Sequence, residues 1–240
     1  MARLLNWPLG IGILDRKPTS GPRSINATAT NSISDFTQSV ASPFGLHSYD
    51  LVLPACKGVK ARRLSGWLTT LHNGANASRV PWYDRDRLSL EEAGVLYSDQ
   101  EKSHGVPWSN GAPWANGKNW NTSRPFVPVV KASAMNSTYV ILADSFWGHR
   151  LGYGDLIGFM PFHFGLYRIT DVLGGGAYQI WPPLRKAIAT TDYATLSPVL
   201  VMRLAGSSGV NTARPHEVMS ETTISMIEVK DADVREYFTE

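Results

Sequence analysis

Histidine and cysteine are the side chains of this sequence that could bind a metal ion or take part in nucleophilic catalysis. The chain has one cysteine, Cys56, and six histidines: His47, His72, His104, His149, His163 and His216. None stands in the H-E-x-x-H or H-x-H spacing of a metal site, and no G-x-S-x-G segment marks a nucleophile. His163 is flanked by two phenylalanines, which indicates a packed side chain, and Cys56 follows an apolar run, which indicates a buried, inert thiol.

Two pairs of carboxylates also have a spacing that metal-binding or catalytic carboxylates can have. Asp84 and Asp86 form a D-x-D pair, but an arginine follows each of them, which indicates a salt-bridged surface loop. Glu91 and Glu92 are adjacent in the chain, so their side chains do not face a common substrate. We therefore expect a protein that is not an enzyme and that uses no metal and no cofactor.

A tryptophan repeat is the most distinctive motif. It reads PWSNGA, PWANGK, NWNTSR over residues 107–124 and places Trp108, Trp114 and Trp120 six residues apart. Asn-Gly is a turn signal, so each of the first two units is predicted to be a turn that presents one indole. The indoles are either packed on their own fold or on the next subunit, or they form an aromatic platform for sugar rings or stacked bases.

Composition limits the remaining function classes. The 240 residues include 21 Gly and 15 Pro and are only 18% charged, which favours many short strands over helices. A net charge of +3 indicates no nucleic-acid specificity. A single cysteine excludes an internal disulfide framework. The N-terminus lacks the features of a signal peptide, and no apolar run is long enough to span a membrane.

The clearest helix signal covers residues 57–73. Leu64, Trp67, Leu68 and Leu71 stand at i, i+3, i+4 and i+7, which makes one apolar stripe. We expect Gly66 to allow close packing of this helix on a sheet. The cations at its start are interpreted either as a solvated face or as a basic patch that meets an acidic partner; they are Lys57, Lys60, Arg62 and Arg63.

Strand signals fill much of the rest. An antiparallel meander is predicted over residues 152–185, with the tight turn at Gly174–Gly176 and its last strand ended by Pro182. Further strands are predicted at 49–53, 79–84, 126–130, 138–143, 199–204 and 222–229. Residues 186–197 are expected to be a polar connection. Residues 1–24, broken by prolines, are expected to be either a flexible terminus or an arm that pairs with a neighbouring subunit.

Several segments resemble a family of tail proteins from long-tailed bacteriophages, and are most similar to its distal tail proteins. The segments are ISDFTQSVASPFG (33–45), GVPWSNGAPWANG (105–117), HRLGYGDLIGF (149–159), GLYRITDV (165–172), IWPPLR (180–185), VMRLAG (201–206) and TTISMIEV (222–229). The resemblance covers most of residues 23–230 in order. The sequence departs from the family at its N-terminal arm and in the tryptophans of the repeat, where other members often carry Phe or His.

The resemblance implies a mainly β fold. An antiparallel β-hub with one packed helix would take residues 25–95 and 198–240, with 1–24 as the arm, and a small inserted β-barrel would take 96–197. The strand at 222–229 would pair with strands near 25–53.

The implied function is structural and includes no catalytic residues. The protein would form a ring, expected to be a hexamer, between the tail tube and the tail hub or tip, and would carry receptor-binding parts. It would be located in the virion after assembly in the host cytoplasm. The alternative is a carbohydrate- or receptor-binding module of the virion that uses Trp108, Trp114 and Trp120.

Overall fold

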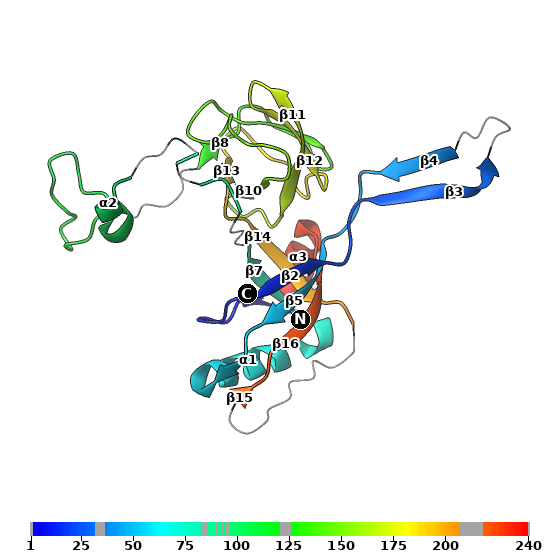
Figure 1. The fold of residues 1–240 in the computed structure, drawn as a ribbon, viewed down its shortest axis with the longest axis horizontal. Helices are drawn as coiled ribbons and strands as arrows, with labels where there is room; N and C mark the ends of the chain where they lie inside the picture. The colour runs from blue at the N-terminus through cyan, green and yellow to red at the C-terminus, as the bar shows by residue number, and fades with distance from the viewer. Residues whose placement is uncertain are drawn as a thin grey trace.

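The chain folds mainly into β-strands, as the composition predicts (Figure 1). The structure is a computed structural model that describes residues 2–31, 37–82, 86–89, 91–92, 94, 97–120, 126–206 and 218–239. Most strands belong to two sheets, one of seven strands and one of six.

The seven-stranded sheet combines both ends of the chain. Its order is β17-β1-β7-β14-β16-β5-β2. The strands are β1 (Ala2–Asn6), β2 (Asp15–Pro18), β5 (Ser48–Leu53), β7 (Ala77–Pro81), β14 (Val199–Leu204), β16 (Thr222–Glu228) and β17 (Phe238–Thr239). β16 pairs with β5 in antiparallel register from Thr222 opposite Leu53 to Ile227 opposite Ser48. The predicted pairing of the 222–229 strand with the 25–53 region is thus confirmed.

The N-terminal segment belongs to this same sheet. β1 lies between β7 and β17 and pairs in parallel with both, while β2 pairs with β5 at the sheet edge. The expectation of a free or exchanged arm is therefore wrong for residues 2–6 and 15–18. The physical reason is that β1 buries Leu4 and fills a gap between two strands, a tertiary contact that its own sequence does not encode.

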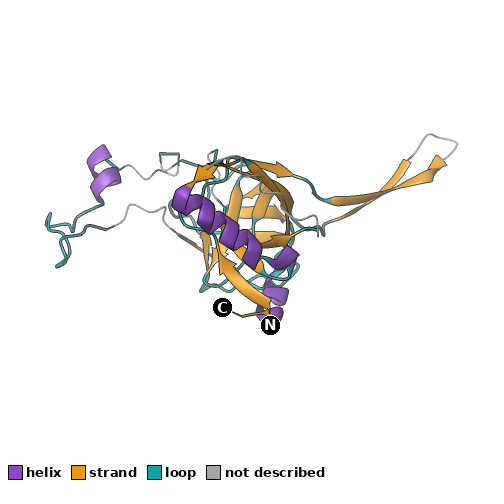
Figure 2. Ribbon diagram, turned by 90° about the horizontal axis from the view of Figure 1, so that it is seen from below, coloured by secondary structure: helices purple, strands orange, loops and turns teal. Residues whose placement is uncertain are grey.

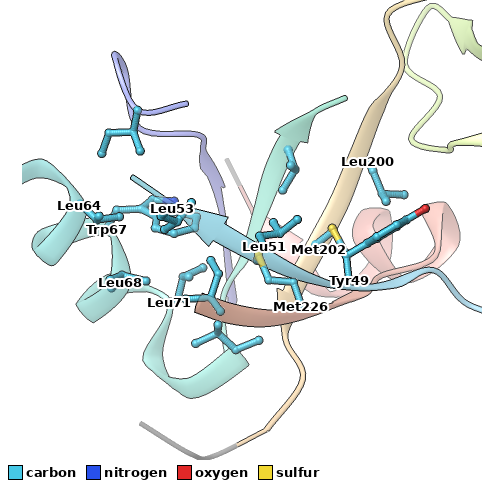
Figure 3. Packing of buried hydrophobic residues seen from close by; sticks show 14 of the residues in the cluster. Tyr49, Leu51, Leu53, Leu64, Trp67, Leu68, Leu71, Leu200, Met202 and Met226 are labelled. Carbon is cyan, nitrogen blue, oxygen red and sulfur yellow. The ribbon is translucent and has the colours of Figure 1, made fainter. Parts of the chain in front are cut away.

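Helix α1 (Gly58–Thr70) covers one face of the seven-stranded sheet. Its predicted stripe is buried with Tyr49, Leu51 and Met226 in a common core (Figure 3). Ser78 of β7 accepts a hydrogen bond from Trp67 Nε1 at 3.3 Å, and Trp7 packs edge-on against Trp67. The helix prediction is confirmed, with β6 (Cys56–Lys57) before it and the 3-10 turn η1 (His72–Gly74) after it; β6 pairs with β15 (Val218–Met219).

Helix α3 (Asp231–Tyr237) covers the opposite face. Alternate residues of a strand point to opposite sides of a sheet, and in β14 Leu200 and Met202 join the α1 core whereas Val201 joins a separate cluster with Val234 of α3. The strands β5 and β16 lie between the two helices in Figure 1. The seven-stranded sheet is therefore sandwiched between α1 and α3.

The six-stranded sheet lies within residues 127–195, in the order β8-β13-β10-β11-β12-β9. Its strands are β8 (Val127–Pro128), β9 (Tyr139–Ile141), β10 (Leu156–Met160), β11 (Tyr167–Gly174), β12 (Ala177–Trp181) and β13 (Tyr193–Thr195). The predicted meander is confirmed as β10-β11-β12. The expectation of a plain connection at 186–197 is wrong, because β13 adds Ala194 to the sheet core.

The edges of the six-stranded sheet approach each other. Val129 and Leu142 form an isolated bridge beyond the ends of β8 and β9, and Val130 N donates to Ile141 O at 3.0 Å. Within the described residues this contact is a bridge and not a full ladder, so the predicted closed barrel is not established. The sheet has a hydrophobic core of its own around Trp147, Tyr167 and Tyr178.

Two parts project from the sheets in Figures 1 and 2: the hairpin of β3 (Arg23–Asn31) and β4 (Thr37–Ser42), and the segment that contains α2 (Asp99–His104). The expectation of one helix is wrong, because α2 and α3 are two further short helices.

Candidate functional site

The tryptophan repeat lies on a small module that α2 begins. Ser98 caps α2 reciprocally: its hydroxyl accepts from Glu101 N at 3.2 Å, and Glu101 Oε2 accepts from Ser98 N at 2.7 Å. After the helix, Val106 and Trp120 exchange both backbone hydrogen bonds, at 2.8 and 2.9 Å. The segment 107–119 is thereby closed into a loop whose two ends are fixed.

The first two repeat units form the same turn, as predicted. Trp108 N donates to Ala112 O at 3.0 Å, and Trp114 N donates to Lys118 O at 2.8 Å. In each unit the asparagine Oδ1 accepts from the backbone N–H two residues later at 3.0 Å, and the following glycine has φ of 77° or 74°. The positive φ explains the glycine of each Asn-Gly pair.

The three indoles meet in one cluster. The ring centroids of Trp108 and Trp114 are 5.0 Å apart, those of Trp108 and Trp120 are 5.5 Å apart, and those of Trp114 and Trp120 are 4.7 Å apart. These are the tilted and edge-to-face contacts that aromatic rings favour. Even so, the side chains remain 44%, 41% and 47% exposed.

The exposure of the indoles shows that their own fold does not cover them completely, which leaves contact with a second subunit or with a ligand. The rings pack on one another, yet the rest of the described chain leaves a large part of each indole open, on a module drawn away from the sheets in Figure 1. Contiguous exposed aromatic surface of this kind marks contact with a partner or ligand. The cluster, Trp108, Trp114 and Trp120, is therefore the main candidate binding surface.

The basic patch of the sequence is also exposed. All four side chains point away from the core on and beside α1: Lys57, Lys60, Arg62 and Arg63. Arg63 Nη1 donates at 3.5 Å to the carbonyl of Leu9, and no ion pair joins any of the four to a carboxylate in the described part of the chain. The patch is thus a second exposed candidate surface.

The described histidines do not form a cluster. His163 is buried and its Nε2 is hydrogen-bonded to the Tyr167 hydroxyl at 2.5 Å, while His149 Nε2 lies 3.1 Å from Leu142 O. His72 and His104 are exposed on separate elements. Among the described residues no three His, Cys, Asp or Glu side chains lie close enough to share a metal ion. Asp84 and His216 lie outside the described residues.

Cys56 is buried, as predicted. Glu91 and Glu92 lie in a turn where Glu92 Oε2 accepts from Ser89 N at 2.7 Å, and the hydrogen bonds from Ser89 lower the pKa of the Glu92 carboxyl.

One buried polar cluster is not predicted by any motif in the sequence. Arg185, at the end of IWPPLR, lies against Glu228 of β16, so the two sheets are joined by an ion pair. Arg185 Nη2 also donates to Gly45 O at 2.5 Å, and Glu228 Oε2 accepts from His47 N at 2.8 Å. Burial lowers the pKa of His47 against the opposing effect of Glu228, so its ring stays neutral and Nε2 donates to Leu166 O at 2.9 Å. The cluster fixes the residues that follow the β3-β4 hairpin.

Comparison with known proteins adds no relative: searches of the sequence against protein families and against curated proteins find no significant match. In the residues that the structure describes, none of the helices has the length and apolar character needed to cross a bilayer.

Proposed function

We propose that the protein is a structural component of a bacteriophage tail. It would form a distal ring, expected to contain six copies, that joins the tail tube to the hub or tip and carries receptor-binding parts. It would act by assembly and by force transmission, without catalysis. Its location would be the virion, after assembly in the host cytoplasm.

The observation that carries this proposal is the path of the chain. The chain leaves the seven-stranded sheet after β7, builds the six-stranded sheet, and returns to the first sheet at β14, where β14 pairs with both β7 and β16. This is the arrangement that the resemblance to distal tail proteins implies, a hub with a second β-unit inserted in it. We propose that residues 198–240 and the N-terminal strands form this hub, and that the Val129–Leu142 bridge closes the inserted unit into a small barrel.

The buried cluster around Arg185 suits a part that transmits force. Two β-units joined only by a flexible linker would move independently, which is the default for domains. Here a bidentate ion pair, the hydrogen bond from Arg185 to Gly45 O and the hydrogen bond from His47 Nε2 to Leu166 O hold the inserted unit against the hub.

The location is tested by labelling. Antibodies raised against the purified protein should decorate virions at the tip-proximal end of the tail in negative-stain electron microscopy. Labelling of the capsid, or absence of the protein from purified virions, would contradict the proposal.

A second function is favoured by the exposed indoles. Because sugar rings stack on aromatic faces, we propose as the alternative that Trp108, Trp114 and Trp120 bind a host surface glycan. Retention of the purified protein on a column of host polysaccharide, lost in Trp114→Ala, would support this function.

A further inference from the structure

The two helices that cover the seven-stranded sheet differ in charge. α1 lies on one face and α3 on the other, as the alternation of Leu200, Val201 and Met202 in β14 shows. The exposed charged side chains of α1 are all cations, whereas α3 exposes the carboxylates of Asp233 and Glu236 beside Arg235, which pairs with the buried Asp231. One subunit therefore presents opposite charges on opposite sides.

The α1 surface combines charge with exposed apolar groups. Residues 51–83 contain no Asp or Glu, so the cations of the basic patch have no neighbouring acid in sequence. Val59 is 52% exposed at the start of the helix, and Leu9, 78% exposed, lies on the loop whose carbonyl Arg63 contacts. This face therefore offers a partner both exposed apolar side chains and the cations Lys60, Arg62 and Arg63.

Gly66 adds an independent observation. A Cβ placed on Gly66 would meet nothing within 4 Å, so the expectation that it allows close packing on the sheet is wrong. Glycine inside a helix costs about 1 kcal/mol relative to alanine. Within the described part of one subunit no group occupies the space that the missing Gly66 side chain leaves. A neighbouring subunit could use this space to approach the helix backbone closely.

The α3 surface is the complement. Asp233 and Glu236 are exposed and lie three residues apart on the helix, so their side chains are on the same side. Tyr237 is 58% exposed beside them. Asp231, by contrast, points inward and pairs with Arg235, with Nε and Oδ1 2.8 Å apart.

We propose that the occupant of the α1 surface is a second copy of this chain, which contributes its α3 surface. Arg62 and Arg63 would face Asp233 and Glu236 of the neighbour, and the neighbour's backbone would approach Gly66. Because the two surfaces lie on opposite faces of one sheet, the contact joins unlike surfaces and repeats from copy to copy; such a heterologous contact forms a closed ring when the rotation between neighbouring copies closes. This inference rests on the proposed ring and names its subunit interface.

The test is charge reversal and its rescue, measured as oligomer mass across protein concentration. The variants are Arg62→Glu with Arg63→Glu, Asp233→Lys with Glu236→Lys, and all four changes together. Lys17→Glu with Lys131→Glu is the matched control, because it makes the same change in net charge as the arginine variant at two exposed lysines outside both helices and outside the tryptophan cluster.

Each double variant should weaken assembly by at least about tenfold, because like charges then face each other, and the fourfold variant should recover assembly. Gly66→Ala should raise the melting temperature of the dissociated chain and still weaken assembly. If the wild type forms a ring and both double variants assemble as the control does, the α1–α3 interface is wrong while the ring stands. If the wild type forms no ring, the proposed function itself fails.

Discussion

Arg185 and Glu228 form a buried, bidentate ion pair between the two sheets. Arg185 Nε lies 2.7 Å from Glu228 Oε1 and Nη2 lies 2.8 Å from Oε2, with the side chains only 5% and 1% exposed. The pair joins residues 43 positions apart in the chain.

Removal of one partner of this pair should destabilise the fold strongly. Arg185→Met leaves the Glu228 carboxylate buried without its cation, and such changes cost about 3–5 kcal/mol. Urea denaturation followed by tryptophan fluorescence measures the loss. Arg185→Met combined with Glu228→Leu should be more stable than Arg185→Met alone, and Arg203→Met, at an exposed arginine, is the control. A loss below about 1 kcal/mol for Arg185→Met would contradict a structural role for the pair.

Stability should fall as the pH drops from about 6.5 toward 4, in part through His163. Burial lowers the pKa of His163 to about 4, with Asp231 opposing this shift. Below pH 6.5 the His163 imidazole therefore binds a proton in the unfolded chain but stays neutral in the folded chain down to about pH 4. Above pH 6.5 this imidazole is neutral in both states. Through His163 the free energy of unfolding should be about 2 kcal/mol lower at pH 5 than at pH 8.

The variant His163→Gln isolates this contribution, because an amide oxygen still accepts from the Tyr167 hydroxyl but does not titrate. Urea unfolding at pH 8 and pH 5 should show a smaller decrease for the variant than for the wild type. Equal decreases would mean that His163 does not cause the pH dependence.

Deletion of residues 1–7 should unfold or strongly weaken the seven-stranded sheet. The deletion removes β1 from between β7 and β17, along with buried Leu4 and the Trp7–Trp67 contact. We expect a loss above about 3 kcal/mol, since one large buried side chain alone is worth about 2–5 kcal/mol. Thermal unfolding by circular dichroism is the measurement, with Lys17→Ala on the exposed edge strand β2 as the control. An unchanged melting temperature would restore the expectation of a free arm.

Trp114→Ala distinguishes the two roles of the indole cluster. The turn itself should persist, because its hydrogen bonds come from the backbone and from Asn116. If the cluster packs between subunits, assembly should weaken by about 2–4 kcal/mol per buried site. If it binds glycan, assembly should be unchanged and adsorption to the host should fall. Val130→Ala, at an exposed apolar residue of the six-stranded unit, is the control. No change in either assay would remove the cluster as a binding surface.

Elements with a strong local pattern were predictable from the sequence. The stripe from Leu64 to Leu71 gave α1 because each of its members is buried, and the alternation of 222–229 gave β16 because one side of that strand faces the core. The period of the tryptophan repeat predicted the two turns but not the contact among the indoles, which depends on how the loop is closed at Val106 and Trp120.

Elements held by tertiary contacts were not predictable. β1 and β13 are short, and each is stabilised by strands on both sides that come from distant parts of the chain. Arg185 and Glu228 each lie in ordinary strand-flanking sequence, and nothing local indicates that they meet. α2 is a different case, because Ser98 and Glu101 have the spacing of a capping box, which is a local signal for the start of a helix.

The most direct test of the central claim is mass photometry of the purified protein, alone and mixed with the tail-tube protein proposed as its partner. The account predicts a closed oligomer, expected near six times the chain mass of 26.4 kDa, that binds the end of the tube. A protein that remains monomeric at all concentrations and does not bind the tube would contradict it.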